Sequence, residues 1–127
     1  MHRLLLPLAL LLASPAAAQD WRMAPEYDVL LTAYDIQPGE IRLKAGEPVR
    51  LRFVNTTNQG LTFSAGGFFR DSKLRRRDSA LVKGGSLQVP ALSTRTIVLV
   101  PKAGRYKATG ANLLHRLLGM SGRIIVE

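Results

Sequence analysis

Short runs in which apolar and polar residues alternate constrain this fold more than any other feature of the sequence. Residues 49–54 read Val-Arg-Leu-Arg-Phe-Val, so both arginines fall on the face opposite Leu51 and Phe53. This period of two is typical of a β-strand with one buried face. Residues 41–44 repeat the pattern with Ile-Arg-Leu-Lys. A chain built from such runs must bury one face of each strand against a second layer.

Further short runs of β-forming residues are separated by turn-forming residues. The strands that we expect cover residues 29–34, 41–44, 49–54, 61–64, 86–90, 94–100, 105–109 and 123–126. The pairs Pro38-Gly39 and Gly84-Gly85 are typical of turns. No segment has the period of a long helix, and residues 66–85 are expected to be irregular. The sequence therefore predicts an all-β sandwich.

The first eighteen residues have the layout of a secretory signal peptide. Arg3 gives a basic start, residues 4–13 are an apolar run, and three alanines at 16–18 form a small-residue cleavage site. The apolar run is too short to span a bilayer as a helix, although an uncleaved anchor remains the alternative. We expect export to a bacterial periplasm and no stable membrane span after cleavage. Residues 19–27 would then form an N-terminal arm and residues 28–127 one domain.

The charge of the chain bears on its partners. There are 18 basic and 9 acidic residues, and removal of residues 1–18 takes away only Arg3, which leaves 17 − 9 = +8. Nucleic acid is a poor match for an exported protein. The expected partner is therefore an envelope protein or another anionic surface.

Five cations lie close together in what we call the basic segment, residues 70–77: Arg70, Lys73, Arg75, Arg76 and Arg77. Asp71 and Asp78 offset them in part. One interpretation is a solvated loop in which Phe68 and Phe69 plug the edge of the sandwich. The other is a docking site for an acidic partner, because arginine binds carboxylates and phosphates through two parallel hydrogen bonds.

The absence of cysteine limits both the stability and the chemistry of the chain. Without disulfides, stability must come from a packed apolar core. Beyond residue 18, the soft metal ligands are only His115, Met23 and Met120. One histidine and no thiol also leave no nucleophile–base pair, so we expect no enzyme activity.

Four segments, at residues 38–46, 49–55, 96–106 and 119–122, carry a recognisable pattern. They read Pro-Gly-x-Ile-x-Leu-x-Ala-Gly, Val-x-Leu-x-Phe-x-Asn, Thr-Ile-x-Leu-x-Pro-x-x-Gly-x-Tyr and Gly-Met-x-Gly. Their order and spacing resemble those of the cupredoxins, the small blue-copper proteins. The resemblance covers about residues 28–127 and implies a Greek-key sandwich of two sheets.

The same resemblance implies where copper ligands would stand. In cupredoxins a Gly-x-Tyr strand leads into a loop of the form Cys-x4-His-x4-Met, which places His115 and Met120 at the last two ligand positions. Gly110 stands at the cysteine position, and Leu61 stands at the first histidine position, or Thr62 if the alignment slips by one. Type 1 copper needs two imidazoles and a thiolate. We therefore expect no blue-copper centre.

These observations predict a non-redox accessory or binding module without a cofactor. The first alternative is copper binding or transport through His115 and Met120, joined by Met23 if the arm reaches the loop. The second alternative is a copper-dependent electron carrier, as in the family. In the remaining interpretation, His115 is an ordinary histidine in an apolar loop and Met120 fills a gap. If the resemblance is right, residues 55–63 and residues 110–120 lie at the same end of the molecule.

Overall fold

A computed structural model describes residues 20–110 and 121–127 of the 127-residue chain. The proposed signal peptide and the candidate ligands His115 and Met120 lie outside the described residues. The described elements, in chain order, are η2 (Trp21–Met23), β1 (Glu26–Leu31), β2 (Ile36–Gln37), β3 (Glu40–Leu43), β4 (Val49–Asn55), β5 (Leu61–Ser64), α2 (Gly66–Asp71), β6 (Lys73–Leu74), η3 (Arg76–Leu81), β7 (Val82–Lys83), β8 (Ser86–Val89), β9 (Thr94–Val100), β10 (Gly104–Gly110) and β11 (Ser121–Val126).

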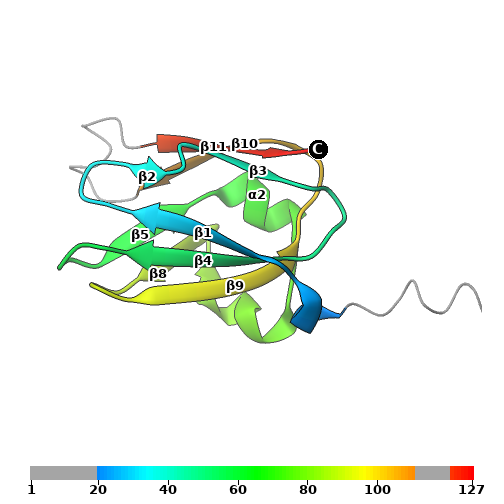
Figure 1. Cartoon of the computed structure of the whole chain (residues 1–127), viewed down its shortest axis with the longest axis horizontal. Coiled ribbons are helices and arrows are strands. Elements are labelled where there is room, and N and C mark those ends of the chain that lie inside the picture. The colour runs from blue at the N-terminus through cyan, green and yellow to red at the C-terminus, as the bar shows by residue number, and fades with distance from the viewer. Residues whose placement is uncertain (1–19, 111–120) are drawn as a thin grey trace, which may run out of the picture.

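The strands form two sheets that pack face to face (Figure 1). The five-stranded sheet has the order β2-β1-β4-β9-β6, and the six-stranded sheet has the order β3-β11-β10-β5-β8-β7. Both sheets are mixed, because β1 runs parallel to β4 and β11 runs parallel to β3. The predicted all-β sandwich is confirmed.

The core forms where the inward faces of the two sheets meet. On β4 the side chains of Val49, Leu51 and Phe53 are buried, whereas the intervening arginines are half-buried on the other face. The ring of Phe53 lies 4.7 Å, centroid to centroid, from that of Phe63 on β5. On β4 the alternation therefore does produce one buried face, whereas β9 and β11 each bury three consecutive residues. The resulting core stabilises a sandwich that has no disulfide.

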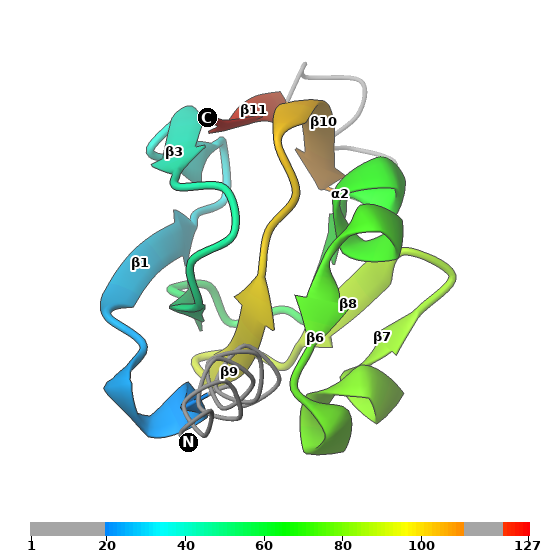
Figure 2. The same ribbon diagram turned by 90° about the vertical axis from the view of Figure 1, so that its right-hand side faces the viewer.

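The prediction that residues 66–85 are irregular is wrong, because the segment contains α2, β6, η3 and β7. The side chains of Phe68 and Phe69 on α2 are buried in the core, which holds the helix against the sandwich. β6 pairs with β9, and β7 pairs with β8. Figure 2 shows these short elements together on one side of the molecule. Each spans six residues or fewer, too few for a periodic pattern to be visible in the sequence.

The residues before position 28, expected to be an arm, are partly built into the sandwich. β1 begins at Glu26, three residues earlier than the strand predicted over 29–34, and it ends at Leu31. Ala24 is buried, and the guanidinium of Arg50 donates a hydrogen bond to the carbonyl oxygen of Trp21 at 3.0 Å. The start of β1 is held by its parallel pairing with β4, in which Glu26 lies opposite Arg50. Because these residues are 24 positions apart, no local pattern in the sequence indicates the pairing.

Candidate functional site

The two described positions of the family's ligand set lie at one end of the sandwich. β5 and β10 are antiparallel neighbours, with Thr109 opposite Ser64 and Gly110 opposite Phe63. Leu61 begins β5 only two residues before Phe63. Residues 55–63 and Gly110 therefore lie together, as the resemblance implied, whereas the rest of the expected 110–120 segment lies outside the described residues. We call the region around residues 55–63 and Gly110 the ligand end.

The described part of the ligand end does not fit type 1 copper. The Leu61 side chain is only 4% exposed, so a hydrocarbon side chain stands where the first imidazole would be. Gly110 offers no side chain at the thiolate position. Thr62 follows Leu61 and therefore points to the opposite, outer face of β5. Among residues 20–110 and 121–127 there is no cluster of three or more His, Cys, Asp or Glu side chains that could hold a metal ion.

The ligand end is organised by the buried carboxamide of Asn55, the last residue of β4. Its Nδ2 donates hydrogen bonds to the carbonyl oxygens of Gln59 at 2.8 Å, Val89 at 3.0 Å and Pro90 at 3.1 Å. Its Oδ1 accepts from the backbone N–H of Thr57 at 2.9 Å and from the Thr57 hydroxyl at 2.8 Å. The carboxamide thus ties the end of β4 to the following loop and to the end of β8.

Most of the basic segment is exposed. Arg70 lies in the last turn of α2, and its side chain is 77% exposed and 3.7 Å from the Asp71 carboxylate. Lys73 on β6 and Arg76 and Arg77 on η3 are exposed and lie beyond ion-pair distance of every acidic residue that the structure describes. These four cations can therefore meet a partner.

Arg75 differs from its neighbours because its side chain is built into the fold. The guanidinium binds the Asp78 carboxylate through Nε at 2.9 Å and Nη2 at 3.2 Å. The side chains are only 15% and 6% exposed. The same carboxylate accepts the backbone N–H of Val98 at 2.9 Å, and the backbone N–H of Arg75 donates to the Val98 carbonyl oxygen at 2.7 Å. The pair therefore attaches η3 to the edge of β9.

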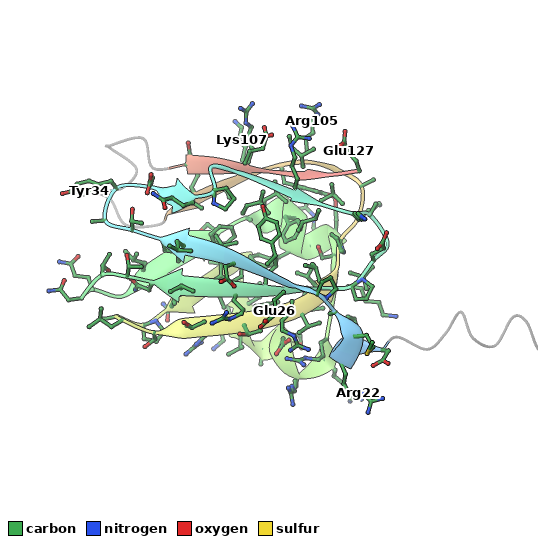
Figure 3. The ribbon with its side chains drawn as sticks, in the orientation of Figure 1. Arg22, Glu26, Tyr34, Arg105, Lys107 and Glu127 are labelled. Atoms are coloured by element: carbon green, nitrogen blue, oxygen red, sulfur yellow. The ribbon has the colours of Figure 1, made fainter. Side chains whose placement is uncertain are left out.

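Most carboxylates of the described residues pair with an arginine, so the cations outside these pairs have no acidic partner among those residues. Seven of the nine acidic residues lie within 3.9 Å of an arginine: Asp20, Glu26, Asp28, Glu40, Asp71, Asp78 and Glu127. Figure 3 shows two of the remaining cations, Arg105 and Lys107 on β10, pointing away from the sandwich. Two other cations outside these pairs, Lys83 on β7 and Arg95 on β9, were not predicted from the sequence as candidate binding residues, because neither stands in a run of like charges.

No helix among the described residues is long and apolar enough to cross a bilayer. No protein-family model matches the sequence, and no curated protein matches it.

Solved structures do match the fold. Auracyanin B is 18% identical, with a TM-score of 0.58 over 82% of this chain and 89% of that chain. Auracyanin from the photosynthetic bacterium Roseiflexus castenholzii is 16% identical, with a TM-score of 0.58 over 82% and 97%. A multicopper oxidase from Pseudomonas thermotolerans is 19% identical, with a TM-score of 0.59 over 80% of this chain and 29% of that chain.

Auracyanins are cupredoxins, so this chain has a cupredoxin-like fold, and the resemblance seen in its sequence is confirmed. Because the chain contains no cysteine, it fits a degenerate member of that fold group. Identities below 20% establish the fold alone.

Proposed function

From a cupredoxin-like fold without cysteine, we propose an exported, non-redox accessory or binding module that works in a bacterial periplasm. One observation carries this proposal: Leu61 and Gly110 stand at two ligand positions and offer copper no ligand atom. The thiolate is the ligand that type 1 copper cannot lose. The absence of a thiolate supports a role without electron transfer through type 1 copper, and the module that we propose has no enzyme activity and no cofactor.

The partner is an anionic protein or surface of the cell envelope, bound through the basic segment. Arg70, Lys73, Arg76 and Arg77 are the residues that support this, since all four are exposed. Arg75 contributes indirectly by holding η3, which carries Arg76 and Arg77, against β9. A basic face of this kind attracts acidic partners, and the attraction weakens with added salt.

The copper part of the proposal is tested by colour. Purified protein covering residues 19–127 is mixed with Cu(II), next to a blue-copper protein as positive control. We expect no intense blue absorption, because the chain has no thiolate to form the coloured bond. An intense blue band would overturn the proposal.

The second candidate function is copper binding or transport through His115 and Met120. The observation that favours it is that the sequence keeps both residues at the family's last two ligand positions. Titration with Cu(I) against a competing chelator tests it. Equal affinity in the wild type and in His115→Ala would reject this function, whereas a clear loss in the variant would support it.

The partner is tested by affinity capture from a periplasmic extract, followed by a binding measurement with the purified prey. Arg76→Ser together with Arg77→Ser should abolish capture, and Lys44→Ser, an exposed cation on the turn between β3 and β4, is the matched control. Arg75 is left unchanged, because its loss would disturb η3 itself. Capture that survives the double substitution would exclude η3 as the contact.

Export is tested by expressing the full chain in a bacterial host and measuring the mass of the protein recovered from the periplasm. We expect a chain that begins at Gln19. A full-length chain found only in the cytoplasm would contradict the proposed address.

A further inference from the structure

Two clefts adjoin on the side of the sandwich that carries β7 and β8. The first has a volume of about 370 Å³, and its lining includes Thr62, Leu81, Lys83, Ser86, Gln88 and Arg95. The second, also about 370 Å³, shares three of these residues and extends to Gly60, Leu61 and Pro90. Because Thr62, Gln88 and Arg95 line both, the clefts form one groove. It reaches from η3 to the ligand end.

The strand pairing leaves this side of both sheets open. β7 pairs only with Leu87 and Ser86 of β8, and β6 pairs only with the last two residues of β9. Within the described residues, Gln88 and Arg95 therefore lie on strand segments without a further strand beside them. Figure 2 shows β9, the short β6, β8 and β7 on this side of the molecule.

The groove is positively charged and has no counter-charge of its own. Lys83 is exposed and Arg95 is half-buried, and neither lies within ion-pair distance of any acidic residue that the structure describes. No acidic residue is part of either lining. Elsewhere Arg42, Arg52 and Arg75 each bind a carboxylate. Two cations in a concave, partly desolvated site attract an anionic ligand.

The rest of the lining suits an extended peptide. Thr62 and Gln88 lie opposite each other on β5 and β8, and they supply a hydroxyl and a carboxamide that can bond to a peptide backbone. Leu81 and Pro90 give apolar walls for aliphatic side chains. The described lining contains no aromatic side chain on which a sugar ring could stack.

We propose that this groove binds an extended acidic segment of a partner protein. The guanidinium of Arg95 takes one carboxylate through two parallel hydrogen bonds, and the ammonium of Lys83 takes a second carboxylate. The proposal rests on the proposed function, since it names the kind of partner. η3 connects the two surfaces, because it carries Arg76 and Arg77 and also lends Leu81 to the groove.

The test uses a defined probe, a fluorescein-labelled acetylated octapeptide of alternating glutamate and alanine. Binding to the protein covering residues 19–127 is followed by fluorescence anisotropy at low salt. We expect saturable binding that weakens as salt is added. The same peptide with glutamine in place of glutamate should not bind. If the acidic peptide does not bind either, the groove proposal is overturned.

Substitutions then locate the binding. Arg95→Gln should weaken the affinity about tenfold, because a charge-assisted pair of hydrogen bonds is lost. The affinity of Arg95→Lys should lie between those of the wild type and Arg95→Gln. Lysine keeps the positive charge but cannot form two parallel hydrogen bonds to one carboxylate. Lys83→Gln should weaken binding several-fold, and Lys44→Gln, outside both clefts, should leave it unchanged. Thermal unfolding of each variant checks that the fold is intact.

The outcomes separate this proposal from the proposed function. If Arg95→Gln binds like the wild type, or no worse than Lys44→Gln, the groove is not the site. If only the pair Arg76→Gln and Arg77→Gln weakens binding, the basic segment is the docking surface and the groove proposal is wrong. If only Arg95 and Lys83 matter, the groove is the site and docking through the basic segment is wrong. A sulfated oligosaccharide that binds more tightly than the peptide through Arg95 would overturn the peptide assignment.

Discussion

Asn55 and Asp78 are the two buried polar side chains among the described residues, and they stabilise two different regions. Asn55 holds the ligand end through five hydrogen bonds of a neutral carboxamide. Asp78 holds η3 on β9 through an ion pair with Arg75 and one backbone N–H. The first region is held by hydrogen bonds of a neutral side chain, whereas the second is held by a buried, charged carboxylate.

The difference separates residues that build the fold from residues that are free to bind. At the ligand end, the hydrogen bonds of Asn55 hold the chain together within the described residues without a metal ligand. In the basic segment, one of five similar cations is used by the fold, and its neighbours Arg76 and Arg77 are left exposed. A cluster of like charges in the sequence can therefore mix both roles.

The largest expected effect comes from breaking the buried ion pair. Asp78→Ala leaves the largely enclosed Arg75 guanidinium, 15% exposed, without its carboxylate and the Val98 N–H without its acceptor. We expect the free energy of unfolding to fall by about 3–5 kcal/mol in urea denaturation. Asp28→Ala, which breaks a pair with Arg52 at the surface, should cost less than about 1 kcal/mol. Similar losses in the two variants would contradict the structural role of Asp78.

Asn55→Ala tests the neutral network. Three carbonyl oxygens lose their side-chain donor, and we expect a loss of about 2–3 kcal/mol in the free energy of unfolding. Asn55→Asp is the sharper variant, because a carboxylate can still accept from Thr57 but cannot donate to the carbonyls. It should be at least as destabilised at pH 7. A loss of under about 1 kcal/mol in both variants would show that the carboxamide does not hold this end.

Tyr106 on β10 connects that strand to α2. Its hydroxyl donates to the Lys102 carbonyl oxygen at 2.9 Å and lies 3.4 Å from Asp71, at the end of α2. Its ring packs edge-on against Phe68 at 5.6 Å between centroids. Tyr106→Phe keeps the ring and removes the hydroxyl, so we expect a loss of about 1 kcal/mol at neutral pH in the same denaturation experiment. No change would mean that water replaces these bonds.

The same tyrosine predicts a pH dependence. Burial, and then the nearby Asp71 carboxylate, raise the pKa of Tyr106 above its ordinary value of 10.0. Above pH 10 the unfolded chain therefore releases this proton before the folded chain does, and the free energy of unfolding falls as the pH rises towards the folded pKa. Below pH 10 the group has no effect. Tyr106→Phe should show a shallower decline in the free energy of unfolding as the pH rises above 10, and an unchanged slope would contradict the shift.

The smallest effect is expected from the exposed arginines. Arg76→Ser together with Arg77→Ser should change the free energy of unfolding by no more than about 0.5 kcal/mol, because neither side chain is bound to an acid that the structure describes. Arg75→Ser should cost several times more, since it leaves Asp78 buried without its partner. Equal costs for the two changes would remove the distinction between the residues of this segment.

Local patterns in the sequence were sufficient to predict many of the strands and the face of β4 that is buried. Alternation over residues 49–54 gave the face of β4 that is buried, and the strands predicted at 105–109 and 123–126 are β10 and β11. The motifs that resemble cupredoxins placed Leu61 and Gly110 at one end, which the pairing of β5 with β10 confirms. The roles of His115 and Met120 stay predictions, because both lie outside the described residues.

The sequence by itself determined that strands would form a sandwich and that no thiolate could bind copper, because period-two alternation and residue type are local properties. Only the tertiary structure decided which arginine of the basic segment is ion-paired within the fold and that Lys83 and Arg95 line one groove. Those facts depend on contacts between residues far apart in the chain, such as Asp78 with Val98 and Thr62 with Gln88. Folding alone brings such residues together, so no short stretch of sequence records them.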